Sequence, residues 1–377
     1  MGQEIVFDPP EGIHLGLPER FYFAADAIGS SDLKVLLRDP ATWWYASRHN
    51  PWRKIRDSKV AHLRKGNALH TLILEGKTAY ERGFAVEPLE TEHNDKARSA
   101  ADIKEMLKKH GVTPPETWDK SKLIDVAKRN KLGSLCWDVI QSDFKTALSR
   151  GRAKISRAED LAFQHMAELV HLHPDLGPWL KSGLTEVSIF WRRPDDPDTL
   201  LRARLDKVSG KLTGDLKTLS NWKAQSTRHA TIRQITEFEY DLQRRFYDEA
   251  RARAREFIAE NKIYVYDQDG EPAALLAEED KVLADIMQAE TWLWVWVFYQ
   301  VRSDEYGKER APVLIPWVHQ PQGRMWDQAG EKVEAALGNY RAYRERYGFE
   351  TPWAEIEPCA EIADEQLGSL LWKGIPE

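Results

Sequence analysis

Cysteine is scarce in this chain: only two of its 377 residues are cysteines, Cys136 and Cys359, and they lie far apart. So few cysteines exclude a framework of several disulfides, a four-cysteine zinc site and a four-cysteine iron–sulfur cluster. The same scarcity fits a reducing compartment, and the sequence therefore predicts a cytoplasmic protein.

Long apolar runs are absent as well. No stretch reaches the roughly 18 residues that a membrane-spanning helix needs, and the longest run covers only residues 292–299. The first residues, MGQEIVFDPPEG, lack a basic region followed by an apolar run. The sequence therefore predicts neither a membrane span nor a signal peptide.

A complete nucleotide-binding loop is also missing. The tripeptide GKT at 76–78 is similar to the end of a phosphate-binding loop, but Thr71 stands where such a loop has its first glycine. We therefore expect no hydrolysis of nucleotides.

Positive charge is in short supply, because 54 lysines and arginines face 60 acidic residues and the net charge is −6. A protein that grips DNA over a broad surface is more often basic, so any contact with nucleic acid must be confined to a local basic groove. Arginine and lysine do cluster at 48–56 and 228–255. Aromatic residues interleave with cations over 41–57, which predicts either a stacking surface for single-stranded or frayed DNA or a helix with an aromatic core face.

Apolar residues are plentiful at 42%, and 15 tryptophans add large side chains, so the chain can build a real core. We divide it into an N-terminal helical part at 1–89, a small helical insertion at 90–135 and a main part at 136–377. Residues 1–28 are expected to be irregular. We expect further helices at 65–75, 156–179, 237–260 and 326–347, and strands at 184–191, 262–266, 292–301 and 313–316. The helix within 156–179 should end near the His173–Pro174 pair.

The insertion contains two short helices, around 101–110 and 120–130, joined by the segment GVTPPETW. This order of helix, extended link and lysine-rich helix resembles the SAP-type DNA-binding motif. The alternative is a plain surface excursion without a binding role.

The segment RARLDKVSGKLTGDLKT at 202–218 predicts two strands joined by a polar turn that contains glycine. Because side chains alternate along a strand, Arg202, Arg204 and Asp206 share one face, and Asp215 and Lys217 share a face of the second strand. If the strands pair, the carboxylates and the ammonium group converge. Such a group can hold a hard divalent cation, activate water and neutralise charge on a phosphate. The alternative is a set of solvated strand ends.

Other polar residues stand out against apolar surroundings. His70 lies on an apolar helix and is either a hydrogen-bonded core residue or a ligand, and Glu186 lies in an apolar strand, where a carboxylate needs a partner or a metal. Gln243 and Tyr247 share one face of the helix at 237–260 with Tyr240. That stripe either packs on the sheet or lines a site.

A helix is expected to begin at 30–32, where Ser30 or Ser31 is either an ordinary N-cap or part of a phosphate-binding helix N-terminus. The helix should end at the Asp39–Pro40 pair.

Six segments, taken in order, resemble the PD-(D/E)XK nuclease superfamily in its RecB/RecE-like branch, and most closely the phage exodeoxyribonuclease VIII-type proteins. They are SSDLKVLLRDPATW, KGNALHTLILE, TEVSIFW, RARLDKV, GDLKT and YDLQRRFY. The resemblance implies an α/β fold with a restriction-endonuclease-like core, in which a central mixed β-sheet is flanked by helices and carries the helical insertion. It makes 1–89 and 136–377 parts of one nuclease domain.

The resemblance also implies roles for individual residues. It makes His70, Asp206 and Asp215 ligands of Mg²⁺, with Mn²⁺ as an alternative, and adds Lys217 and Glu186 to Asp206 and Asp215 as catalytic residues. The residues expected to contact DNA are Ser31, Lys34, Arg204, Gln243 and Tyr247.

The implied function is a Mg²⁺-dependent exodeoxyribonuclease that digests duplex DNA from its ends in the 5′-to-3′ direction, in phage-type recombination or DNA repair. The implied setting is the cytoplasm of a bacterium or phage-infected cell, with a ring-shaped homo-oligomer and a single-strand annealing protein as partner. Two alternatives stay open: a DNA-end-binding or scaffold protein without turnover, and an endonuclease or nuclease subunit of a larger complex.

Overall fold

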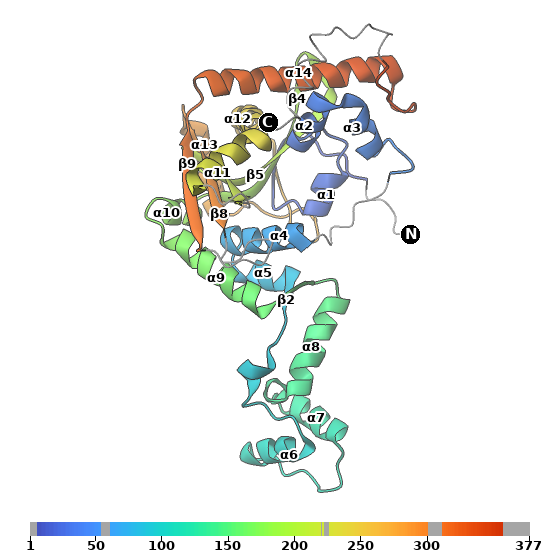
Figure 1. Cartoon of the computed structure of the whole chain (residues 1–377), viewed down its shortest axis with the longest axis vertical. Helices are drawn as coiled ribbons and strands as arrows, with labels where there is room; N and C mark the ends of the chain where they lie inside the picture. Colours follow the sequence, from blue (N-terminus) through green and yellow to red (C-terminus); the bar gives the residue numbers. More distant parts are fainter. Residues whose placement is uncertain (1–5, 54–60, 220, 222–225, 301–310, 357–377) are drawn as a thin grey trace, which may run out of the picture. The chain divides into compact units, whose positions relative to one another are not determined.

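The computed structural model describes residues 6–53, 61–219, 221, 226–300 and 311–356 (Figure 1). The chain forms two compact units. The larger unit consists of Met1–Ser30 and Arg56–Ala329, and the smaller unit consists of Ser31–Ile55 and Gly330–Glu377.

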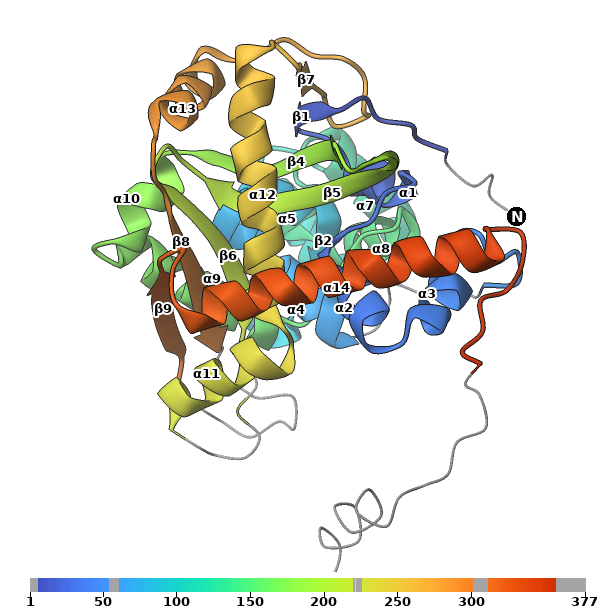
Figure 2. The same ribbon diagram turned by 90° about the horizontal axis from the view of Figure 1, so that it is seen from above.

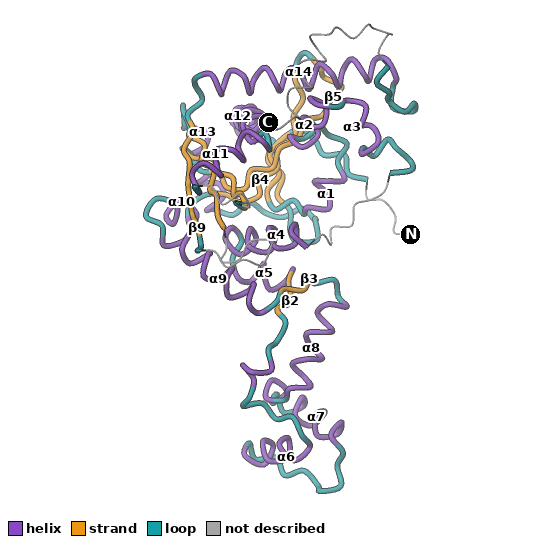
Figure 3. The backbone as a smooth tube through the Cα atoms, viewed as in Figure 1, coloured by secondary structure: helices purple, strands orange, loops and turns teal. Residues whose placement is uncertain are grey.

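A seven-stranded mixed sheet lies at the centre of the larger unit, in the order β7-β1-β4-β5-β6-β8-β9. Its strands and the surrounding helices are distinguished in Figure 3. Neighbouring strands are antiparallel except for the parallel pairs β1–β7 and β6–β8. The strands are β1 (Gly12–Leu15), β4 (Leu184–Arg193), β5 (Asp196–Val208), β6 (Leu212–Thr218), β7 (Ile263–Val265), β8 (Leu293–Gln300) and β9 (Val313–His319).

Helices cover the sheet on both faces, which confirms the expected α/β class with a large mixed sheet flanked by helices. Helix α12 (Tyr240–Ala259) contacts β1, β4 and β5 and runs across the strands in Figure 2. On the other side, one apolar core joins α4 (Ala61–Leu74), α9 (Arg157–Leu172) and α10 (Leu176–Lys181) to β6 and β8. Each fully buried large apolar side chain contributes about 1.5–3 kcal/mol, so this core anchors the strands that carry the polar residues.

The β5–β6 hairpin forms as predicted, with buried Leu201, Ala203 and Leu205 alternating with half-buried Arg202 and Arg204 along β5. Strand β8 is an interior strand, also as predicted, because it pairs with β6 and β9 and is buried from Trp294 to Gln300.

The insertion lies between the paired strands β2 (Phe84–Val86) and β3 (Ala153–Ile155). Its two expected helices are present as α6 (Ala100–Lys109) and α7 (Lys120–Arg129), followed by α8 (Trp137–Ser149), with short 3₁₀ turns at Glu90–His93 and Gly133–Leu135. Ser99 caps α6 and Asp119 caps α7. The insertion shares a small core with the start of α8, made of Ala97, Ile103, Leu107, Leu123, Ala127, Cys136 and Val139.

The smaller unit contains most of α2 (Ser30–Arg38) and α14 (Arg324–Tyr347) and all of α3 (Pro40–Ala46). Trp43 packs on Tyr340 and Trp353, and the indole of Trp44 donates a hydrogen bond to the Phe349 carbonyl. These two tryptophans therefore belong to a core, which was one of the two interpretations of the aromatic and basic segment at 41–57. Residues 54–57 of that segment lie outside the described part.

Some elements differ from the expectations. Residues 1–28 are not irregular throughout, since they contain β1 and the helix α1 (Glu19–Ala24); β1 is only four residues long and exists because it pairs with β4 and β7. The helix expected at 237–260 is α12, which begins at Tyr240 because Glu239 before it is left-handed, with a φ of 51°. Helix α11 (Thr227–Glu237) was not predicted. The helix expected from residue 156 is α9, which ends at Leu172, close to the expected end at His173–Pro174, and α10 follows it.

Helices α5 (Lys77–Gly83) and α13 (Ala277–Gln288) were not predicted. No helix in the described ranges is long and apolar enough to cross a membrane.

Candidate active site

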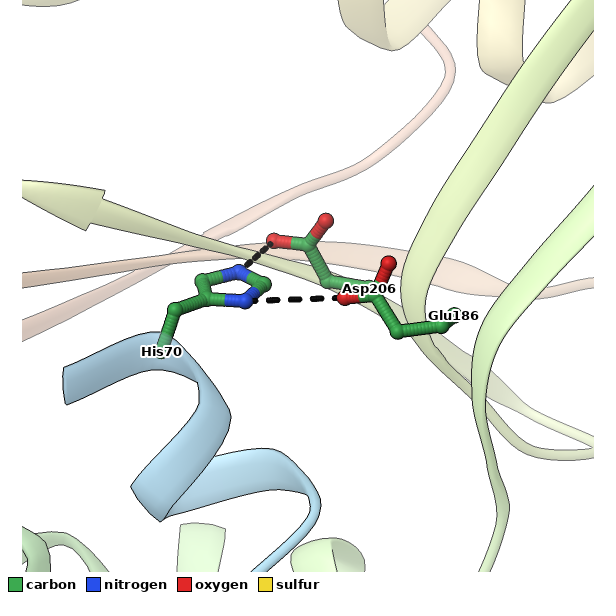
Figure 4. A group of neighbouring side chains, drawn as sticks. All are labelled: His70, Glu186 and Asp206. Atoms are coloured by element: carbon green, nitrogen blue, oxygen red, sulfur yellow. Dashed lines mark hydrogen bonds and ion pairs between the residues drawn. The ribbon is translucent and has the colours of Figure 1, made fainter. Parts of the chain in front are cut away.

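His70, Glu186 and Asp206 lie together beside the central sheet (Figure 4). Helix α4 supplies the histidine, and the neighbouring strands β4 and β5 supply the carboxylates. His70 Nε2 lies 2.8 Å from Oδ2 of Asp206, and His70 Nδ1 lies 3.5 Å from Oε1 of Glu186. One potential ligand atom from each residue lies within 4.8 Å of the others. The predicted ligand set was His70, Asp206 and Asp215, whereas Glu186, for which the sequence left a partner or a metal open, takes the third place in this group.

The backbone of Glu186 is unusual for a strand residue. Its φ is 51°, in the left-handed region, although its neighbours Thr185 and Val187 keep their register with Lys207 and Leu205. A non-glycine residue in this region is held at a cost of roughly 1–2 kcal/mol, and such residues cluster at functional sites. The distortion places the Glu186 carboxylate beside His70 and Asp206.

Asp215 and Lys217, on strand β6, form a second polar group next to the first. Lys217 Nζ lies 2.6 Å from Oδ2 of Asp215, and Gln243 Nε2 donates to the other carboxylate oxygen at 3.1 Å. The ammonium group also lies 4.7 Å from the centre of the Tyr240 ring. Asp215 is therefore held by Lys217 and Gln243 and is not a member of the ligand-spaced group of three.

The backbone joins the two groups. The N–H of Leu216, between Asp215 and Lys217, donates to Oδ2 of Asp206 at 2.8 Å. The hairpin thus brings both aspartates and the lysine to one place, as their spacing in the sequence predicted.

Charge and burial shift the ionisation of these groups strongly. Burial lowers the pKa of His70, but the charge of Asp206, its hydrogen bond and the charge of Glu186 outweigh burial and raise that pKa to about 9. Burial raises the pKa of Glu186 to about 7, against the opposing effect of His70. Burial also raises the pKa of Asp215 to about 6, although Lys217 acts in the opposite direction.

The remaining two groups shift toward their charged forms. Burial opposes ionisation of Asp206, yet its partners His70 and Lys217 hold its pKa below the ordinary value. Burial lowers the pKa of Lys217, but Asp215 and Asp206 more than offset this and raise it. Glu186 has a further cationic neighbour, since Arg204 Nε lies 4.0 Å from its Oε2. Three carboxylates thus share three cationic partners, and burial keeps the pKa values of Glu186 and Asp215 elevated.

This donor set fits a divalent cation. Carboxylate oxygens are the ligands that Mg²⁺ prefers, and an imidazole nitrogen beside them also suits Mn²⁺. The raised pKa values of Glu186 and Asp215 arise first from burial, with a further contribution from the charge of Asp206. Bound positive charge would favour the ionised form of both carboxylates.

Three of the residues expected to contact DNA make bonds within the protein. Arg204 donates from Nε to the Ser188 hydroxyl at 2.9 Å and from a terminal nitrogen to the Leu17 carbonyl at 2.8 Å. Gln243 is buried and bonded to Asp215. Tyr247 is buried too, and its side chain hydrogen-bonds to Ser30 and Gln243. Ser30, one candidate for a phosphate-binding N-cap, thus has a partner from α12.

Ser31 and Lys34 lie in α2 and belong to the smaller unit. Ser31 is exposed in the first turn of that helix, and Lys34 is half-buried.

Sequence reasoning missed three residues close to this site. The Thr218 hydroxyl donates to the Tyr299 hydroxyl at 3.4 Å, and burial raises the pKa of Tyr299 to about 12. Burial also raises the pKa of Glu75, which interacts with His70 and Arg204. The position of Thr218 directly after Lys217 is a signal that could have pointed to it. Tyr299 had no such signal, because it reaches the site through the parallel pairing of β8 with β6.

No family model matches the chain, and no curated protein matches it either.

Proposed function

We propose that this protein is a metal-dependent DNA nuclease of the PD-(D/E)XK type. The observation that carries the proposal is the ligand-spaced group of His70, Glu186 and Asp206 directly beside the Asp215–Lys217 pair. A structural ion pair needs two groups, whereas this site gathers five ionisable side chains from three strands and a helix. The central mixed sheet is compatible with a restriction-endonuclease-like core, which forms part of the proposal.

In this proposal, His70, Glu186 and Asp206 hold a divalent cation, with Asp215 beside them. A bound Mg²⁺ or Mn²⁺ would polarise the phosphodiester and lower the pKa of a water molecule. Lys217 would orient the attacking water or stabilise the negative charge that develops on the phosphate. Gln243 and Tyr240 keep Asp215 and Lys217 in place, through the hydrogen bond and the ring contact described above.

The preference for DNA ends, the 5′-to-3′ direction, the ring-shaped oligomer and the annealing partner rest on the resemblance of six sequence segments to the RecE-like branch. We propose the recombination or repair role on the same basis.

The deciding experiment compares linear with covalently closed circular duplex DNA in the presence of Mg²⁺. The wild-type protein should digest only the linear substrate, and Asp215→Ala should abolish digestion. Asp198→Asn is the matched control, because Asp198 is an exposed carboxylate on β5, the strand that carries Asp206. Cleavage of the circle would replace the proposal with an endonuclease, and failure to cleave either substrate would favour a DNA-end-binding scaffold.

A further inference from the structure

We infer that helix α7 of the insertion presents a docking surface for the phosphate backbone of duplex DNA. The inference rests on the proposed function, since it names a second place at which the nuclease holds its substrate. The surface consists of Lys122, Lys128, Arg129 and Lys131, and we call it the α7 surface. All four side chains are exposed, and none has an ion pair or side-chain hydrogen bond within the described part of the chain.

Helix α6 neighbours α7 and is also ten residues long, but its lysines do form ion pairs. Lys104 and Lys108 pair with Glu116 at 3.1 and 3.7 Å. Lys109 pairs with Glu105 at 2.9 Å. The lysines of α6 are thus neutralised by carboxylates of the insertion, and the four cations of the α7 surface are not.

Helix stability accounts for only part of this pattern. Lys128 and Arg129 lie in the last turn of α7, where a cation favourably meets the helix dipole. Lys122 lies in the first turn, where a cation is unfavourable, and Lys131 lies beyond the helix end. Asp125 is three and four residues from Lys122 and Arg129, a spacing that permits ion pairs, yet it forms no such pair.

The surroundings of the α7 surface favour duplex DNA over other polyanions. No large apolar side chain is strongly exposed between residues 96 and 152, all of which are described. A helix that lies in a membrane surface needs an exposed apolar face, and single-stranded nucleic acid is usually held by exposed aromatic rings. Charge alone suffices for the backbone of a duplex. A local cationic surface also fits a chain whose net charge is −6.

The test measures binding of the full-length protein to a short blunt duplex, by fluorescence anisotropy at several salt concentrations, with EDTA present to prevent cleavage. One variant replaces Lys122, Lys128 and Arg129 with glutamine. Its matched control replaces Lys104, Lys108 and Lys109 with glutamine, which removes the same charge from α6.

Each lost phosphate contact reduces the magnitude of the slope of log K against log salt by about 0.9. The slope of the α7 variant should therefore be smaller in magnitude by about 2.7. This corresponds to roughly 100-fold weaker binding at about 0.15 M salt. The magnitude of the slope should fall in the α6 variant by less than half of this amount. Lys122→Gln alone should reduce the magnitude of the slope by about 0.9. This single exposed substitution checks the result with little risk to folding.

Equal losses in the two triple variants would show a general charge effect and would overturn the inference, as would an α7 variant that binds like wild type. Competition by single-stranded DNA or by anionic vesicles that exceeds competition by duplex would also overturn it. Asp215→Ala should keep the α7-dependent binding. If that binding is found and no condition gives cleavage, the proposed nuclease activity fails and the α7 surface stands.

Discussion

Two histidines of the larger unit show opposite ionisation. His14 on β1 is fully buried, and burial lowers its pKa to about 4. His70 on α4 keeps 24% of its side chain exposed, and its pKa is raised to about 9. Burial disfavours the charged form of both rings, so burial alone does not separate them.

Their partners make the difference. His14 packs against the rings of Phe190, Tyr264 and Tyr266, and its nitrogens bond to the Tyr266 hydroxyl and the Pro10 carbonyl, all uncharged groups. His70 lies between two carboxylates. A histidine with neutral partners serves the core, whereas one between carboxylates is equipped to exchange its proton for a metal ion.

The largest expected effect comes from removing the charge beside His70. Asp206→Asn should lower the rate of DNA cleavage by about 10³-fold, in the range found when one catalytic group is lost. It should also move the pKa of His70 down toward its ordinary value, because Asp206 is its strongest charged partner. Cleavage assays and an NMR titration of the histidine rings measure the two effects.

The ring of His14 should titrate as before in Asp206→Asn, since none of its hydrogen-bond partners has changed. If the pKa of His70 stayed near 9 in this variant, the assignment of its charge to Asp206 would be wrong.

Removing the other histidine should affect stability rather than chemistry. His14→Ala leaves a cavity among three aromatic rings, and we expect the free energy of unfolding to fall by about 3 kcal/mol. Urea denaturation measures this loss. The folded variant should cleave DNA at the wild-type rate, and a large loss of activity per folded molecule would contradict a purely structural role for His14.

Acid should also reduce the stability of the folded protein through His14. Its pKa is about 4 in the folded protein and about 6.5 in the unfolded chain, so between these values the unfolded state binds more protons. The stability that His14 contributes is complete above about pH 6.5 and is lost as the pH falls toward 4. We expect a loss of about 2 kcal/mol by pH 5.

Unfolding curves measured between pH 7 and 5 test this acid sensitivity, with His14→Gln as the comparison because glutamine does not titrate. The variant should lose less stability than wild type over this range. Parallel curves for the two proteins would contradict the lowered pKa.

The sequence revealed those parts of the fold whose signals are local. The alternation of charged and apolar residues identified β5, and the turn residues between Val208 and Leu212 identified its hairpin with β6. Strand β1 carried no such signal, because GIHL is four residues long and its strand form depends on pairing with β4 and β7. The start of α12 at Tyr240, not at residue 237, was not predicted either, since the left-handed Glu239 before it has no signature in the sequence.

The same limit applied to the candidate site. Asp206, Asp215 and Lys217 were found together because one hairpin carries all three. The arrangement around them was not accessible from the sequence. The left-handed Glu186 enters the ligand-spaced group in place of Asp215, and Gln243 and Tyr247 turn inward to bond within the protein. These outcomes depend on strand register and helix packing between distant segments.

The smallest expected effect concerns a neutral partner. Gln243→Ala removes the donor to Asp215 and should lower kcat by about tenfold, at the lower end of what loss of an outer partner of a metal site costs. KM should change little, because Gln243 is buried and acts by positioning Asp215. Gln234→Ala removes another buried glutamine, on α11, and should leave kcat unchanged. A rise in KM with kcat preserved would instead show that Gln243 binds DNA directly. Its role would then not be that of an uncharged partner that positions Asp215.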